Sequence, residues 1–208
     1  MYDLMRSHSY VRVKICGVTR VEDAVVAEEA GADAVGVVMY SDSPRSICPD
    51  EAEKIFAALG PFTARVVVTH TTSPDDLDRV IALHPAAVQV SHLHDVPRAA
   101  GVQVIRVVEG VPLPPHADAY IVDRSCGTGR PFDPAAVRAV MRESRVPVVL
   151  AGGLDPRNVR AAVEAFHPYA VDVCSGVERV PGVKDPALIR AFVAAARGCP
   201  SGENGRPA

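Results

Sequence analysis

The stretch that decides the fold is residues 11–20, Val-Arg-Val-Lys-Ile-Cys-Gly-Val-Thr-Arg. Its apolar residues alternate as in a short β-strand, and the run breaks at Gly17 before a segment that begins like a helix. We expect Thr19 or Arg20 near the N-cap of that helix. The stretch therefore predicts a strand that passes through a tight turn into a helix, and the rest of the chain repeats this pattern.

Lys14 and Cys16 lie two residues apart in this strand, so both side chains project from the face opposite the apolar one. A nearby ammonium favours a thiolate over a thiol, which makes Cys16 a candidate base or nucleophile. The alternative is that Cys16 is a small buried hydrophobe and Lys14 a surface charge. The stretch alone leaves both interpretations open.

Seven further apolar segments predict strands. They cover residues 34–39, 64–69, 87–91, 102–108, 119–122, 147–150 and 170–173. Helices are expected over residues 21–30, from 49 to 59, from 73 onward, and over 133–143, 155–166 and 186–197, with room for only a short helix in 92–100. Three prolines between Glu109 and Ala117 exclude a regular helix there.

Eight such units predict an α/β fold, a single-domain (β/α)8 TIM barrel with a degraded fifth helix. An open doubly wound sheet is the alternative, but no GxGxxG follows the first strand. We expect an N-terminal extension at 1–10, the catalytic barrel at 11–198 and a flexible C-terminal tail at 199–208.

The amino-acid composition excludes some classes of binding partner. The 208 residues carry a formal net charge of -3, which gives no basic field for nucleic acid. No apolar run approaches the roughly 20 residues needed to span a membrane. Five irregularly spaced cysteines indicate neither a disulfide framework nor a zinc site, so we expect a cytoplasmic protein.

Candidate catalytic groups follow two of the predicted strands. In a barrel the active site lies at the carboxyl ends of the strands, where Cys16 and Asp123 would serve as general base and general acid in an isomerisation. Asp123 also fits a helix cap or an ion-pair partner of Arg124. Arg45 fits a clamp for a substrate carboxylate or, equally, a solvated loop charge.

Glycine-bearing loops follow the last three strands. Gly152-Gly153 and Ser175-Gly176 are typical of a phosphate cradle, although glycines also serve tight turns. Gly127 and Gly129 fit either a phosphate loop or a mobile lid. Asp172 either orients a catalytic group or pairs with Lys14.

Several motifs together resemble phosphoribosylanthranilate isomerase, in the right order from about residue 11 to 197. They are Lys14-Ile15-Cys16-Gly17-Val18-Thr19, Ser43-Pro44-Arg45, Asp123 with Gly127-Thr128-Gly129-Arg130-Pro131-Phe132-Asp133, Ala151-Gly152-Gly153-Leu154 with Asn158, and Asp172-Val173-Cys174-Ser175-Gly176-Val177-Glu178 with Pro181-Gly182-Val183-Lys184-Asp185.

The resemblance implies an Amadori rearrangement of N-(5-phosphoribosyl)anthranilate in tryptophan biosynthesis. It implies that Asp123 protonates the ring oxygen, that Cys16 removes the proton from sugar C2, and that Arg45 holds the anthranilate carboxylate. It also implies a phosphosugar as the partner, without a metal or cofactor. Composition predicts no nucleic acid and no membrane as partner, and the sequence leaves a monomer or a homodimer open. The expected substrate-binding residues are Lys14, Arg45, Gly127, Gly129, Gly152, Gly153, Asp172, Cys174, Ser175 and Gly176.

The chain departs from the family pattern at three places. This chain has Gln89-Val90-Ser91-His92 where the family usually has Gln-Leu-His-Gly. It also has Cys174 in place of the usual Ser, and Arg130 in place of the commoner Lys. Two other functions remain as alternatives: a different phosphosugar barrel, such as a metal-dependent pentulose-phosphate epimerase, and a non-catalytic binder of a phosphorylated ligand. An epimerase of that kind would need His and Asp metal ligands at the strand ends, and the sequence shows no such set. A non-catalytic binder would have no need of both Cys16 and Asp123.

Overall fold

The structure, a computed structural model, describes residues 10–92, 96, 101–123 and 131–198. Eight parallel strands form a closed barrel in chain order, with β8 paired to β1. The strands are β1 (Arg12–Ile15), β2 (Ala34–Met39), β3 (Ala64–Thr69), β4 (Ala87–Val90), β5 (Gln103–Val108), β6 (Ala119–Val122), β7 (Val148–Leu150) and β8 (Ala170–Val173). The predicted single-domain (β/α)8 barrel is therefore confirmed.

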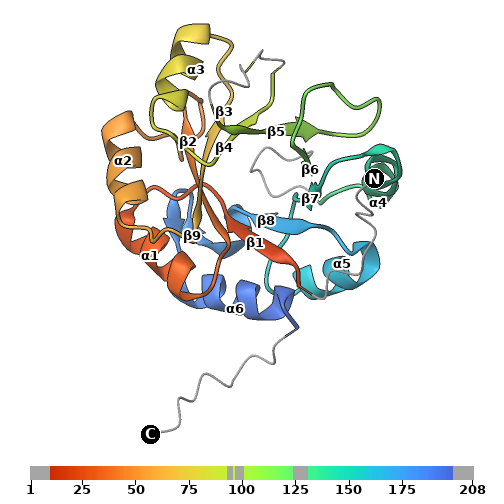
Figure 1. Cartoon of the computed structure of the whole chain (residues 1–208). Helices are drawn as coiled ribbons and strands as arrows, with labels where there is room; N and C mark the ends of the chain where they lie inside the picture. Colours follow the sequence, from red (N-terminus) through yellow and green to blue (C-terminus); the bar gives the residue numbers. More distant parts are fainter. Residues whose placement is uncertain (1–9, 93–95, 97–100, 124–130, 199–208) are drawn as a thin grey trace, which may run out of the picture.

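Helices surround the strands (Figure 1). Those in the described ranges are α1 (Val21–Glu29), α2 (Pro49–Ala57), α3 (Pro74–Ile81), α4 (Pro134–Glu143), α5 (Val159–Phe166) and α6 (Pro186–Ala196). Outward-facing strand residues such as Val13 and Ile15 are fully buried in the layer between strands and helices. That burial orients the alternate residues of β1, Lys14 and then Cys16, toward the barrel interior.

The fifth helix is degraded, as predicted. The chain between β5 and β6 is a loop with no helix, in which Arg106 Nε donates to the carbonyls of Pro115 at 3.0 Å and His116 at 3.2 Å. The hydroxyl of Tyr120 also donates to the carbonyl of Pro114. These bonds hold a proline-rich segment that cannot form helical hydrogen bonds of its own. The short helix considered for residues 92–100 falls mostly outside the described residues.

One expected helix start was wrong and another was confirmed. The helix after β7 begins at Val159, not Asp155, because the Asp155 carboxylate accepts the backbone N–H groups of Arg157 at 2.7 Å and Asn158 at 3.2 Å, which makes a turn first. Arg20 occupies the N-cap of α1 without a side-chain cap bond. Thr19 donates instead to the carbonyl of Gly182 at 2.5 Å.

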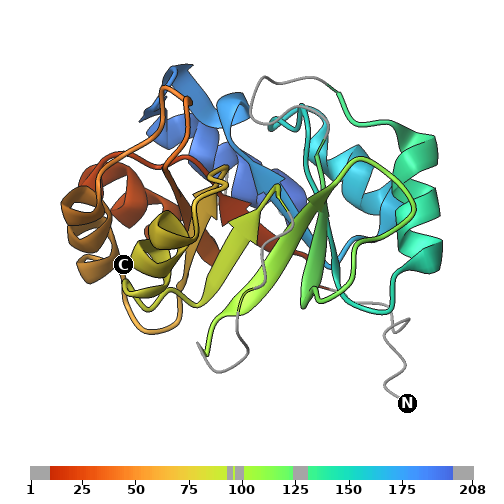
Figure 2. The same ribbon diagram turned by 90° about the horizontal axis from the view of Figure 1, so that it is seen from above.

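The sequence analysis missed a hairpin between β8 and α6. A 3-10 turn at Ser175–Val177 leads into β9 (Glu178–Val180), which pairs antiparallel with β10 (Val183–Lys184). Figure 2 shows this segment in blue at the upper edge of the molecule. The hairpin follows β8 directly, so it lies over the end of the barrel where the site was predicted.

Both expected tails, residues 1–10 and 199–208, lie outside the described residues apart from Tyr10. Among the helices described above, none is long and apolar enough to cross a membrane.

Candidate active site

A cavity of about 740 Å³ opens at the carboxyl ends of the strands. Eight residues predicted for the site line it: Cys16, Arg45, Asp123, Gly152, Gly153, Asp172, Cys174 and Ser175. The predicted Gly127 and Gly129 lie outside the described residues. The barrel thus brings together candidate groups that are far apart in the sequence.

A buried ion pair lies at the floor of the cavity. Lys14 and Asp172 are register partners on β1 and β8, and the Lys14 ammonium donates to Asp172 at 2.6 Å and to Gln89 of β4 at 3.1 Å. The Asp172 pairing left open by the sequence is therefore present. Burial raises the pKa of Asp172 to about 7, although the Lys14 charge opposes that rise. Burial lowers the pKa of Lys14, but Asp172 and Cys16 more than offset this and raise it overall, so the ammonium stays charged at neutral pH.

Cys16 and Cys174 form a thiol pair two residues beyond this ion pair. Each follows the end of its strand, β1 or β8, and their side chains pack together. The hydrogen bond with Cys174 and burial raise the pKa of Cys16 well above its usual value, although the Lys14 charge lowers it. The expected depression of the Cys16 pKa was therefore wrong, because a second thiol and burial outweigh the ammonium.

The lowered thiol pKa is found at Cys174 instead. The hydrogen bond from Cys16, together with the charges of Lys184 and Arg45, lowers the pKa of Cys174 to about 7 despite its burial. Lys184 Nζ lies 3.7 Å from the Cys174 sulfur. Of the two thiols, Cys174 therefore has the lower pKa and loses its proton first as the pH rises.

Asp123 approaches the same cavity from β6. Its backbone N–H donates to Val108 at 3.2 Å, which ties it to β5, and its side chain is half-buried. Its charge contributes to the raised pKa of Asp172, so the two carboxyl groups are electrostatically coupled. In the described ranges there is no group of three or more His, Cys, Asp or Glu side chains that could hold a metal ion.

The glycine loops after β7 and β8 pack against each other. Gly152 and Gly153 have φ of 91° and 66°, a left-handed conformation that favours glycine. A Cβ on Gly176 would come within 2.0 Å of the Leu154 carbonyl oxygen, so only glycine allows the loops this close. The close packing leaves Gly152, Gly153 and Ser175 on one wall of the cavity.

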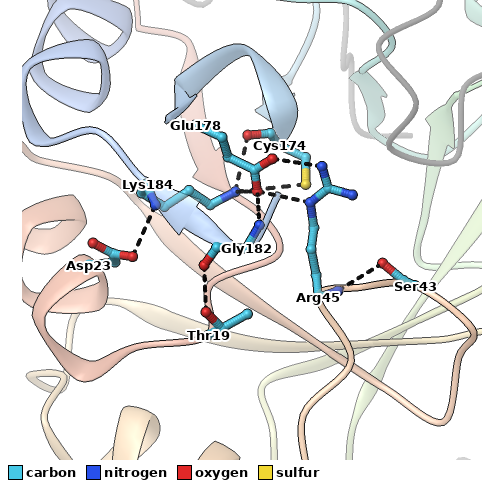
Figure 3. A network of polar contacts seen from close by, with 8 residues as sticks. All are labelled: Thr19, Asp23, Ser43, Arg45, Cys174, Glu178, Gly182 and Lys184. Carbon is cyan, nitrogen blue, oxygen red and sulfur yellow. Dashed lines mark hydrogen bonds and ion pairs between the residues drawn. The ribbon is translucent and has the colours of Figure 1, made fainter. Parts of the chain in front are cut away.

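Arg45 enters a network that the sequence analysis did not predict (Figure 3). Its Nε and Nη2 atoms donate to the two carboxylate oxygens of Glu178 at 2.8 and 2.6 Å. Lys184, whose side chain is 0% exposed, donates to the same carboxylate at 2.9 Å. The Pro181-Gly182 turn between Glu178 and Lys184 was a signal for a hairpin that would bring these two side chains together.

Comparison with known protein families identifies the family of this chain. The family model of N-(5'phosphoribosyl)anthranilate (PRA) isomerase matches residues 13–195. The chain belongs to this family. It is 53% identical over 189 residues to the N-(5'-phosphoribosyl)anthranilate isomerase of Methanoregula boonei, covering 90% of this chain and 97% of that protein.

Solved structures agree with this membership. The phosphoribosyl anthranilate isomerase of Thermus thermophilus matches with a TM-score of 0.79 and 36% identity over 90% of this chain and 99% of that one. A second isomerase structure, in complex with reduced 1-(o-carboxyphenylamino)-1-deoxyribulose 5-phosphate, matches with a TM-score of 0.74 and 37% identity over 91% of this chain and 100% of that one. The resemblance noted in the sequence is confirmed, together with the isomerase class and the fold.

Proposed function

We propose that this chain isomerises N-(5'-phosphoribosyl)anthranilate to 1-(2-carboxyphenylamino)-1-deoxyribulose 5-phosphate, a step of tryptophan biosynthesis, with Cys16 as general base and Asp123 as general acid. The observation that carries these roles is that a thiol and a carboxyl group, from β1 and β6, line one cavity. The two strands are separated in the barrel by β7 and β8, which leaves room for a sugar between the two groups.

Asp123 starts the reaction. Its carboxyl group gives a proton to the furanose ring oxygen, the C1–O bond breaks, and the anilino nitrogen supplies the electron pair that forms a Schiff base. Cys16 as thiolate then removes the proton from sugar C2, and the electron pair moves toward nitrogen to give the enolamine, which tautomerises to the ketose. The raised pKa of Cys16 makes its thiolate a strong base but a minor species, so we expect turnover to increase with pH in the neutral range.

Two further groups hold the ends of the substrate. We place the anthranilate carboxylate on the guanidinium of Arg45, which lines the cavity and is held in place by Glu178. We place the phosphate at Gly152, Gly153 and Ser175, which line the same cavity and where backbone N–H groups can approach an anion.

Further assignments belong to the same proposal. Asp172 and Cys174 line the cavity and Lys14 pairs with Asp172, Gly176 contributes by its close packing, and Gly127 and Gly129 are further substrate-binding residues. We also propose a cytoplasmic enzyme that acts on a phosphosugar without a metal or cofactor and is a monomer or a homodimer.

The decisive experiment follows the loss of anthranilate-type fluorescence as freshly prepared phosphoribosylanthranilate is consumed. Turnover by the native protein should fall by about 100- to 10,000-fold in Cys16→Ala and in Asp123→Asn, the range typical for loss of a general acid or base. Cys48→Ser is a matched control, because Cys48 is a free, exposed thiol outside the cavity. Absence of turnover by the folded native protein would refute the proposed activity, and full turnover by either variant would refute the role of that residue.

A further inference from the structure

The hairpin β9–β10 buries a lysine under the substrate cavity. Lys184 is the register partner of Glu178, and its ammonium donates to the Glu178 carboxylate at 2.9 Å and to the Cys174 carbonyl at 3.0 Å (Figure 3). The side chains of Lys184 and Glu178 are 0% and 4% exposed. Desolvating two charges is costly, so a fully buried pair needs a reason beyond stability.

Glu178 uses both of its oxygens on Arg45. Arg45 Nε at 2.8 Å and Nη2 at 2.6 Å form a bidentate pair with the carboxylate, which fixes the plane of the guanidinium as well as its position. The backbone N–H of Gly182 adds a further bond to Glu178 at 3.2 Å. Glu178 is therefore held by three groups and cannot rotate away from Arg45 without breaking them.

The same hairpin is tied to the segment that carries the proposed base. The Thr19 hydroxyl, three residues after Cys16, donates to the Gly182 carbonyl at 2.5 Å. The backbone N–H of Lys184 donates to the buried Asp23 carboxylate of α1 at 3.1 Å. The orientation of Arg45 is thus connected, through the hairpin, to the loop that follows β1.

Two cations of the network share one carboxylate. Glu178 pairs with both Arg45 and Lys184, and the Cys174 sulfur, whose pKa these two cations lower, lies 3.7 Å from the Lys184 ammonium. Among the described residues, no hydrogen bond or ion pair uses Nη1 of Arg45, and Arg45 lines the cavity. The arrangement suits one more anion, planar and able to accept from the guanidinium.

We propose that Glu178 and Lys184 are positioning residues that orient Arg45 and make the site selective for a substrate with an aromatic carboxylate. The inference rests on the proposed function, because it takes the anthranilate carboxylate as the ligand of Arg45. Glu178 sets the plane of the guanidinium, and Lys184 offsets the Glu178 charge so that Arg45 still attracts an anion. Neither residue contacts the reacting atoms in this scheme.

The experiment compares two inhibitors by calorimetry. One is reduced 1-(o-carboxyphenylamino)-1-deoxyribulose 5-phosphate, and the other is the same compound without the ring carboxylate. The native protein should bind the carboxylated compound about 10- to 100-fold more tightly, as expected for hydrogen bonds to a charged group. In Glu178→Gln this preference should fall to a few-fold, while the affinity for the compound without the carboxylate stays the same.

Several variants separate positioning from structural damage. Glu178→Asp keeps the charge and should retain part of the preference, and Lys184→Met keeps the Arg45–Glu178 pair but should also lose much of it. Lys184→Met decides the question if Glu178→Gln does not fold. Glu164→Gln removes a carboxylate from an exposed arginine pair on α5 and should change neither affinity.

The outcomes distinguish the two hypotheses. A native protein that binds neither compound would overturn the proposed function. A native protein that binds both equally, while it still turns over phosphoribosylanthranilate, would overturn the placement of the anthranilate carboxylate on Arg45 and this inference with it. A native protein that discriminates, alongside folded Glu178→Gln and Lys184→Met variants that discriminate equally well, would overturn only the positioning role.

Discussion

The two ends of the barrel both carry charged clusters, but of different kinds. At the carboxyl ends of the strands, Lys14 with Asp172 and Lys184 with Glu178 are almost completely buried. At the amino ends, Arg197 of the α6 C-terminus pairs with Asp33 at 3.1 Å, and these side chains are 23% and 29% exposed. The first cluster surrounds a cavity, whereas the second connects segments of the fold.

The amino-end cluster fastens the last helix to the beginning of the barrel. Arg197 donates to the carbonyl of Gly31 and to the hydroxyl of Tyr10, which in turn donates to Asp33 at 2.8 Å. Asp33 also accepts the backbone N–H of Val13 at 2.8 Å. Partly exposed charges of this kind lose little solvation, so we infer that this cluster serves stability and the buried one serves catalysis.

The strongest test of this comparison removes both charges of the buried pair. In Lys14→Met/Asp172→Asn, we expect kcat/KM at neutral pH to fall roughly 100-fold, because loss of the cation raises the pKa of Cys16 further and leaves less of the thiolate base. The free energy of unfolding should stay the same or rise by about 1 to 4 kcal/mol, since the desolvation cost disappears. Fluorescence turnover and urea unfolding measure the two effects.

The opposite result would contradict this distinction between the two ends of the barrel. If the double variant lost several kcal/mol of stability and retained its activity, the buried pair would be a structural element like the one at the amino ends. Single variants are less informative, since each leaves one buried charge without its partner.

The second test addresses the amino ends. Arg197→Met keeps much of the aliphatic stem and removes the bonds to Gly31, Tyr10 and Asp33. We expect the free energy of unfolding to fall by about 1 kcal/mol with kcat unchanged, because several partly exposed bonds are lost together. Arg160→Met is the matched control, since Arg160 forms one exposed pair with Glu164 and should show almost no change. A marked loss of kcat in Arg197→Met would show that the amino ends also serve catalysis.

The sequence predicted the barrel better than it predicted the network around the site. Alternating apolar residues and strand–helix spacing are local signals, so they predicted all eight strands to within about one residue at each end. The pairing of Glu178 with Arg45 depends on a contact across 133 positions and on a hairpin of two short strands. No local pattern contains that contact, although the Pro181-Gly182 turn indicated the hairpin itself.

The electrostatics of Cys16 show the same limit. Lys14 is two residues away and lowers the pKa of Cys16 as its spacing suggested, but Cys174 is 158 positions away and has the larger effect in the opposite direction. Only closure of the barrel between β8 and β1 brings the second thiol beside the first. The prediction for the pKa of Cys16 was wrong because it considered Lys14 and left out Cys174.

Cys174→Ser tests this last point with the smallest expected effect. Serine is the usual family residue at this position, so the variant should fold. Cys174 and burial raise the pKa of Cys16; without the Cys174 thiolate the pKa of Cys16 falls, and more of the base is deprotonated at a given pH. The rise of kcat/KM with pH should therefore move to lower pH. Alkylation of Cys16 by iodoacetamide, located by mass spectrometry, should become faster at neutral pH for the same reason.

Cys48→Ser should change neither measurement, because Cys48 is an exposed thiol at the start of α2. A shift to higher pH in Cys174→Ser would mean that Cys174 assists the deprotonation of Cys16, and the two thiols would then act as one base.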